Sequence, residues 1–365
     1  MTKDKNLSVI NYDDLQSKTM DWLRFPLMIA VCFIHVHQQV LIDMHPSVAA
    51  HSIFFLITQI LARLAVPLFF IISGYYFFYN KNSQECIFNK EIYILKLKKR
   101  IRTLLIPYLF WNFVVLCIYF AGYLFVRHTW MSPIQVLSAF CYYKGTNATI
   151  AFQFWFIRDL MIVCIISPIL YFLLKKGKLL TLLLLLVLWM SPLELFPFSK
   201  VAVFFFSLGA FFSINGRNII KDIARLPKYP LYLLTGVFMI ADLLLNEQPA
   251  TTVHVVTNNI YVHNVFILLG IATVLSIISE CFRVGKLKNV NKQLANASFF
   301  LFAVHPLPLS QILNKLPAMV LSHNDFTFFI IYLLSVPLIA VISVWVYNFL
   351  KKRFPKFTAI ITGGR

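Results

Sequence analysis

The sequence predicts an all-α fold, a polytopic membrane helix bundle, from its composition, its apolar runs and the positions of its basic residues. Of the 365 residues, 59% are hydrophobic and 13% are charged, whereas soluble domains average roughly 45–50% and 25%. A soluble core cannot bury that much apolar surface. The sequence therefore excludes a soluble globular protein and favours helices that cross a bilayer as one membrane domain.

Runs of about 20 apolar residues mark the candidate spans, because a helix of that length crosses the hydrocarbon core. About ten such runs are separated by polar breaks. They cover residues 21–42, 53–79, 103–126, 153–174, 179–196, 198–214, 230–246, 259–282, 296–314 and 327–350. Pro192 and Pro197 interrupt the fifth and sixth, which allows a broken hairpin in place of two full crossings.

The basic residues indicate how these spans are oriented. With a cytoplasmic N-terminus, 26 of the 33 Lys and Arg residues fall on the inner side, 4 on the outer side and 3 within spans. This is a strong positive-inside pattern, and it predicts that both termini are cytoplasmic. The expected division is a cytoplasmic segment at 1–20, a transmembrane domain at 21–350 and a basic cytoplasmic tail at 351–365.

The net charge of +19 is then explained mainly by the orientation of the chain in the membrane, with lipids as its neighbours. No nucleic-acid partner is needed to explain it. The six cysteines show no CxxC spacing, and neither an HExxH nor a nucleotide-binding glycine loop occurs. We therefore expect no metal site and no nucleoside-triphosphate hydrolysis.

Ionisable residues inside spans are functional or paired by default, because each costs about 2.5–3.5 kcal/mol on insertion scales. Those that point to chemistry are Arg24, His35, Arg63, Arg158, Asp159, Asp242 and His305. Arg24 and His35 are eleven residues apart, which places them within about 20° of one helix face and about 16 Å apart along the axis. They are expected to line one groove wall, with Arg24 near its cytoplasmic mouth. His37 is expected to point to the other side of the helix. The structural alternative is that Arg24 reaches the headgroups and His35 bonds a backbone carbonyl.

Arg63 lies too deep in the second span to reach either headgroup layer, so we expect a buried partner, either Asp159 or Asp242. Arg158 and Asp159 are adjacent on a helix and are expected to serve different neighbours. A dense basic stretch lies just cytoplasmic of the third span. Its members are Lys96, Lys98, Lys99, Arg100 and Arg102. Anionic lipid headgroups or a nucleotide-bearing ligand from the cytosol are the alternative partners for this stretch.

Five local patterns together resemble one family. Arg24 and His35 are separated by ten residues; VPLFFIISGYYFF contains Ser73 and Gly74; KKRIRTLLIPY enters the third span; FWFIRDL covers 154–160; and SFFLFAVHPL contains His305. In this combination and order, the chain resembles the acyltransferase 3 family, integral-membrane bacterial enzymes that O-acetylate sugars of surface polysaccharides, lipopolysaccharide and related glycans.

The resemblance implies a multi-pass protein of the bacterial cytoplasmic (inner) membrane with no permanently bound cofactor. Acyl-CoA, usually acetyl-CoA, would be the donor substrate, and a glycan or lipid-linked sugar the acceptor. In the family the first-helix Arg and His are regarded as essential, which corresponds to Arg24 and His35. The basic stretch contributes to donor binding, here Lys99, Arg100 and Arg102. A homo-oligomer is compatible with this architecture.

Acyl transfer to a hydroxyl requires a base, stabilisation of the oxyanion and positioning of two substrates. His35 fits the base, or a nucleophile that forms an acyl-imidazole, and His305 is a second candidate acid or base. Arg24 can hold the donor, and Arg63 or Arg158 can bind the oxyanion. With Asp159 and Ser73 the two arginines form the predicted substrate-binding set. The alternative function is a transporter or flippase for an anionic small molecule or lipid-linked sugar.

Overall fold

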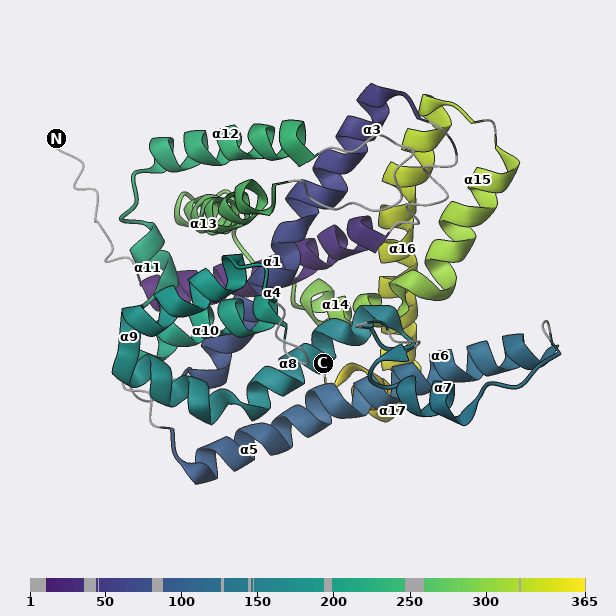
Figure 1. The fold of residues 1–365 in the computed structure, drawn as a ribbon, viewed down its shortest axis with the longest axis horizontal. Helices are drawn as coiled ribbons and strands as arrows, with labels where there is room; N and C mark the ends of the chain where they lie inside the picture. The colour runs from purple at the N-terminus through teal and green to yellow at the C-terminus, as the bar shows by residue number, and fades with distance from the viewer. Residues whose placement is uncertain are drawn as a thin grey trace.

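Every regular element in the described part of the chain is a helix (Figure 1). The computed structural model describes residues 11–35, 44, 46–80, 88–125, 128–143, 146, 148–193, 199–246, 259–321 and 323–364. The predicted all-α class is therefore confirmed for these residues.

Each predicted apolar run overlaps helical structure. The long elements are α1 (Tyr12–His35), α3 (Val48–Phe55) with η1 (Leu56–Leu61), η2 (Ala62–Leu64) and α4 (Ala65–Phe78), α5 (Lys90–Arg100) with η3 (Ile101–Leu105) and α6 (Ile106–Phe125), η5 (Phe152–Phe154) with α8 (Trp155–Ile165), α9 (Ser167–Met190), α10 (Lys200–Ile214), α12 (Lys228–Asn246), α13 (Ile260–Arg283), α14 (Lys292–Val304) with η6 (His305–Lys315), and α16 (Asp325–Arg353). Short helices are α7 (Pro133–Ser138), α11 (Ile219–Ile223), α15 (Leu316–Val320) and α17 (Pro355–Thr362). Hydropathy alone thus located the helices well, although their ends shift.

Within the described residues, five helical stretches are long and apolar enough to cross a membrane, or six if α8 and α9, bent by 62° at their junction, count as one span. The structure therefore supports a multi-pass membrane protein. Ten crossings and cytoplasmic termini stay predictions. One reason for the lower count is that α10 has only 15 residues. A second is that charged residues such as Asp13, Asp14, Lys18 and Asp21 lie in the first half of α1.

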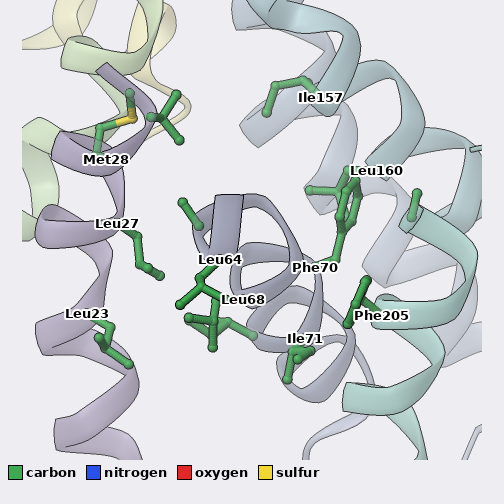
Figure 2. Packing of buried hydrophobic residues seen from close by; sticks show 14 of the residues in the cluster. Leu23, Leu27, Met28, Leu64, Leu68, Phe70, Ile71, Ile157, Leu160 and Phe205 are labelled. Carbon is green, nitrogen blue, oxygen red and sulfur yellow. The ribbon is translucent and has the colours of Figure 1, made fainter. Parts of the chain in front are cut away.

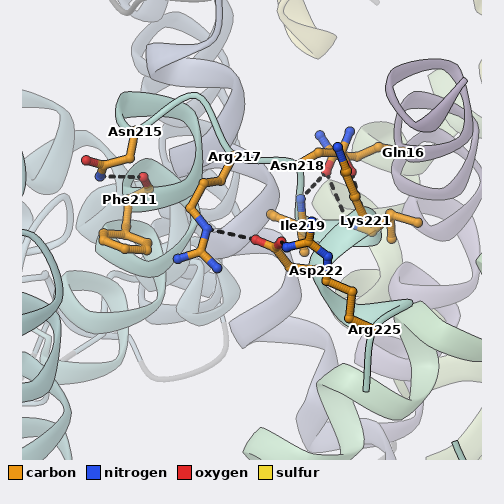
Figure 3. A network of polar contacts seen from close by, with 10 residues as sticks. Gln16, Phe211, Asn215, Arg217, Asn218, Ile219, Lys221, Asp222 and Arg225 are labelled. Atoms are coloured by element: carbon orange, nitrogen blue, oxygen red, sulfur yellow. Dashed lines mark hydrogen bonds and ion pairs between the residues drawn. The ribbon is translucent and has the colours of Figure 1, made fainter. Parts of the chain in front are cut away.

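The first helix begins nine residues earlier than its apolar run, because polar contacts stabilise that end. The Asn11 side chain accepts hydrogen bonds from the backbone N–H groups of Asp13 and Asp14, which caps the helix. Gln16 Oε1 accepts the N–H of Ile219 at 2.7 Å, at the start of α11 (Figure 3). This polar network ties the start of α1 to the turn between α10 and α11.

The core around α4 depends on two glycines. A Cβ on Gly74 would lie 2.0 Å from the carbonyl oxygen of Phe206 in α10, and a Cβ on Gly209 would lie 2.0 Å from that of Ile71. Small residues let membrane helices approach closely, so α4 and α10 pack backbone to backbone. Buried side chains of α1, α4, α8 and α10 meet around them (Figure 2). This contact holds one wall of the site described next.

Candidate active site

A cavity of about 480 Å³ lies among α1, the η2–α4 region, the α5–η3 junction, α8, α14 and the residues after α17. Six of the sequence-predicted site residues line it, namely Arg24, His35, Arg63, Ser73, Lys99 and Arg100. The Arg24–His35 spacing therefore does place both side chains on one cavity. His37 lies outside the described residues. His305 does not line the cavity, but it contacts His35, which does.

The two histidines form a hydrogen-bonded pair. His35 Nδ1 lies 2.9 Å from His305 Nε2. His305 Nδ1 in turn lies 2.9 Å from the carbonyl oxygen of Phe302 and 3.3 Å from that of Leu301. Because a carbonyl oxygen can only accept, the proton of neutral His305 resides on Nδ1, and its Nε2 is an acceptor. His35 then carries its proton on Nδ1 and donates it to His305, so Nε2 is the unprotonated nitrogen of a ring that lines the cavity.

The surroundings hold both imidazoles in place. His305 is only 1% exposed, and the Phe152 ring contacts His35 edge-on with a centroid distance of 5.0 Å. Gln153 Nε2 donates to the carbonyl oxygen of Ala303 at 3.0 Å, which fixes α14 two residues before His305. Gln153 is not among the residues predicted from the sequence, although an amide inside the aromatic run FQFWF is a recognisable signal of a buried, hydrogen-bonded group.

Arg63 has no carboxylate partner among the described residues, so the predicted ion pair with Asp159 or Asp242 is wrong. Its Nε–H donates to Gln59 Oε1 at 3.1 Å, and Nη2 contacts the same oxygen. Gln59 lies one turn earlier on η1, and a neutral amide satisfies part of the guanidinium without cancelling its charge. Asp242 is engaged elsewhere, 2.8 Å from His263 Nδ1. Arg63 therefore presents a positive charge to the cavity.

Arg158 and Asp159 pair with each other, which contradicts the expectation that they serve different neighbours. Both Nε and Nη2 of Arg158 lie 2.9 Å from Asp159 Oδ1. Nη1 donates to the carbonyl oxygen of Cys141 at 2.8 Å, and the guanidinium lies over the Tyr142 ring at 4.6 Å. The arginine side chain is long enough to fold back over its neighbour although their Cβ atoms diverge. Neither residue lines the cavity, and the pair holds Cys141 and Tyr142 against α8.

The basic stretch divides into different roles. Lys99 and Arg100 line the cavity together with Thr103, whose buried Oγ1 has no hydrogen-bond partner among the described residues. Lys96 donates to the Phe77 carbonyl at the end of α4. Arg102 is exposed and lies outside the cavity wall. At the same end Arg24 pairs with Asp21 at 3.0 Å while still lining the cavity.

Three π-helical segments flank these residues. η3 begins directly after Arg100, η6 begins at His305, and η1 carries Gln59, which holds Arg63. A π-helical turn inserts an extra residue into the helix and changes the direction of the side chains that follow, and such turns are frequent at functional sites. Their position here indicates that the local helix geometry serves the cavity.

The acyltransferase domain of the acyltransferase 3 family matches residues 17–352. The chain therefore belongs to this family of acyltransferases, as the motif combination predicted. It is 31% identical over 167 residues to the succinoglycan biosynthesis protein ExoH of Rhizobium meliloti (strain 1021). That alignment covers 44% of this chain and 43% of the relative, so the chain spans less than half of the length of the relative it matches. No solved structure matches the chain.

Proposed function

We propose that this protein is a membrane O-acyltransferase that moves an acyl group, in this proposal acetyl, from acyl-CoA to a hydroxyl of a cell-surface or lipid-linked glycan. The observation that carries the proposal is a single cavity with Lys99 and Arg100 in its wall and the His35 ring, whose Nδ1 is engaged by His305, in the same wall. An acyl-CoA donor needs both features, because its nucleotide is anionic and its thioester must meet a base.

The size and length of the cavity suit this donor. About 480 Å³ falls within the range of roughly 300–1,000 Å³ found for small-molecule sites. Along α1, Arg24 and His35 are about 16 Å apart by helix rise. A long, narrow pantetheine arm can span that distance with its phosphates at the basic end, whereas a compact donor cannot. The predicted topology places that end on the cytoplasmic side, where acyl-CoA is available.

In the proposed reaction, His35 Nε2 takes the proton from the acceptor hydroxyl as its oxygen bonds to the thioester carbonyl carbon. The carbonyl electron pair moves onto oxygen, and the Arg63 guanidinium stabilises this negative charge. When the charge returns to form the ester carbonyl, the carbon–sulfur bond breaks and the thiolate leaves. The proton on His35 then goes to sulfur, so the products are an ester and the free CoA thiol.

His305 acts in this scheme as a positioning residue. His305 accepts a hydrogen bond from Nδ1–H of His35, which keeps Nε2 of His35 unprotonated and its ring oriented. It also stabilises the His35 imidazolium once that Nε2 is protonated. We prefer general-base catalysis over an acyl-imidazole on His35, because the former needs no covalent intermediate. The polysaccharide class of acceptor is supported by the relative named for succinoglycan biosynthesis.

Membranes containing the protein, labelled acetyl-CoA and cell-surface glycan test the proposal. We expect label in the glycan with the wild type and none with His35→Ala, whereas His263→Ala, a histidine outside the cavity, retains transfer. Uptake of an unmodified solute without transfer of label would support the transporter alternative and overturn the proposal. Acyl label that stays on the protein after rapid denaturation would favour the covalent route.

A further inference from the structure

The segment after α16, expected as a basic tail, packs against the bundle. The indole Nε1–H of Trp111 in α6 donates to the carbonyl oxygen of Ile361 at 2.9 Å. The rings of Phe110 and Phe357 meet edge to face with a centroid distance of 5.8 Å. Thr358 is also buried. These contacts dock α17 on α6 and direct the residues after it toward the cavity.

Gly363 packs directly against the η3 backbone at the basic end of the cavity. It has a φ of +71°, and a Cβ placed on it would lie 2.3 Å from the carbonyl oxygen of Thr103. Thr103 belongs to η3, the π-helical turn that follows Arg100. Gly363, Gly364, Thr103 and Arg100 all line the cavity. The chain after α17 is therefore packed backbone to backbone on the turn beside the candidate donor-binding residues.

The residues after α17 offer a donor a packing surface rather than hydrogen bonds. The N–H of Gly363 already faces the carbonyl oxygen of Ile360 at 3.4 Å, and that of Gly364 donates to Ala359 at 2.6 Å. These bonds close the end of α17 and leave neither amide free to bind a phosphate. What the segment supplies is a wall of the cavity packed against η3.

We propose that Gly363 is a positioning residue for the acyl-CoA donor. This inference rests on the function proposed above. By allowing α17 to close on the Thr103 carbonyl, Gly363 sets the width of the basic end of the cavity and the direction of Lys99 and Arg100. A Cβ at this position must push η3 away, because 2.3 Å is far below a carbon–oxygen contact distance of roughly 3.4 Å.

The test compares Gly363→Ala with Gly285→Ala in the purified full-length protein. Gly285 also has a positive φ, +75°, but no atom lies within 4 Å of its Cβ position. Both variants therefore place an alanine on a backbone with a positive φ, and only Gly363→Ala adds the clash. Because misplacement by about 1 Å can cost up to roughly 100-fold, we expect Gly363→Ala to raise the KM for acetyl-CoA roughly 10- to 100-fold. The acceptor KM should stay unchanged and kcat should fall much less.

Calorimetric binding of CoA supplies a readout that does not depend on turnover. Weakened CoA binding by Gly363→Ala and wild-type binding by Gly285→Ala support the inference. If Gly363→Ala folds and binds CoA like the wild type, the inference is overturned and the proposed function stands. A wild type that binds no CoA would overturn the proposed function and this inference with it.

Trp111→Phe decides the question if Gly363→Ala does not yield folded protein. It keeps an aromatic ring on α6 but removes the indole N–H that bonds Ile361. We expect a smaller rise in the acetyl-CoA KM, about 3- to 10-fold, since one hydrogen bond contributes roughly 1 kcal/mol. An unchanged KM and CoA affinity in a folded Trp111→Phe protein would then overturn the inference.

Discussion

Two hydrogen-bonded pairs within the bundle each contain a histidine, but they differ in which groups remain available to a substrate. His35 donates to a neutral histidine, His305, whose other nitrogen bonds a backbone carbonyl. His263 pairs with the Asp242 carboxylate at 2.8 Å, between α13 and α12. The first pair leaves an unprotonated nitrogen on a ring in the cavity wall. The second is a satisfied contact between two helices, and neither of its members lines the cavity.

The surroundings of the two pairs follow the same division. His263–Asp242 is one of several polar contacts that join α12 to α13 along their length. The others are Lys228–Glu280 at 2.8 Å, Tyr232–Ser276 at 2.9 Å and Thr235–Thr273 at 2.7 Å. Around His35 the nearby cation, Arg63, is hydrogen-bonded to the neutral Gln59 amide and has no carboxylate partner within the described part of the chain. Partner type therefore separates buried polar groups that hold helices together from those that can act on a substrate.

The largest effect is expected from removing the base. His35→Ala should lower acyl transfer by about 10³-fold or more, because general acid–base catalysis contributes roughly 10²–10⁴-fold. Label transfer from acetyl-CoA in purified protein measures this loss, and thermal unfolding checks that the variant remains folded. His263→Ala is the matched control and should retain transfer. Equal loss of activity in both variants would remove the distinction between the two pairs.

Arg63→Gln should lower kcat by roughly 10²–10³-fold, the loss typical of removing one donor to an oxyanion. The acetyl-CoA KM should change little, because the charge develops only in the transition state. Steady-state kinetics with both substrates varied separates the two parameters. If the KM rises while kcat is unchanged, Arg63 binds the donor instead.

His305→Phe should lower kcat about 10- to 100-fold, because His35 then loses the acceptor that keeps its proton on Nδ1. His305→Gln is the informative companion. Its amide oxygen can accept the same hydrogen bond, and we expect it to recover most of the activity. A pH–rate profile for each variant adds a readout that a packing defect would leave unchanged. Failure of Gln to rescue would argue against the positioning role.

Lys99→Ala and Arg100→Ala should each raise the acetyl-CoA KM by roughly tenfold, since a charge-assisted contact contributes about 1.5–3 kcal/mol. Arg102→Ala should raise it less, because this side chain is exposed and outside the cavity wall. Varying the salt concentration distinguishes a direct contact from general attraction of the nucleotide. Equal effects at all three positions would indicate that the whole stretch acts as a diffuse charge.

Asp242→Ala should have the smallest effect on catalysis and a measurable effect on stability. It leaves His263 without its partner, which should cost about 1–2 kcal/mol by analogy with polar contacts between membrane helices. Thermal unfolding in detergent should show the loss, while kcat and both KM values stay close to wild type. A large decrease in kcat would show that the α12–α13 pair also influences the active site.

Sequence information alone established the all-α membrane class, the helix positions and the chain's family. These depend on local properties, namely hydropathy over about 20 residues and motifs such as the Arg24–His35 spacing, which one helix turns into a shared face. The same spacing correctly placed both residues on one cavity. Local pattern also located the basic stretch at the end of that cavity, through Lys99 and Arg100.

Three-dimensional packing settled which side chains meet. The partners of Arg63 and Arg158 were predicted wrongly, because a charged side chain can reach several neighbours and the final choice depends on how the helices are arranged. The hydrogen bond between His35 and His305 joins residues 270 positions apart, and no local pattern encodes it. The packing of Gly363, just after α17, against Thr103 likewise depends on a surface that exists only after α6 and η3 have packed. Contacts between distant segments follow from the summed packing energy of the whole bundle, which is why the sequence located the helices and the fold assembled the site.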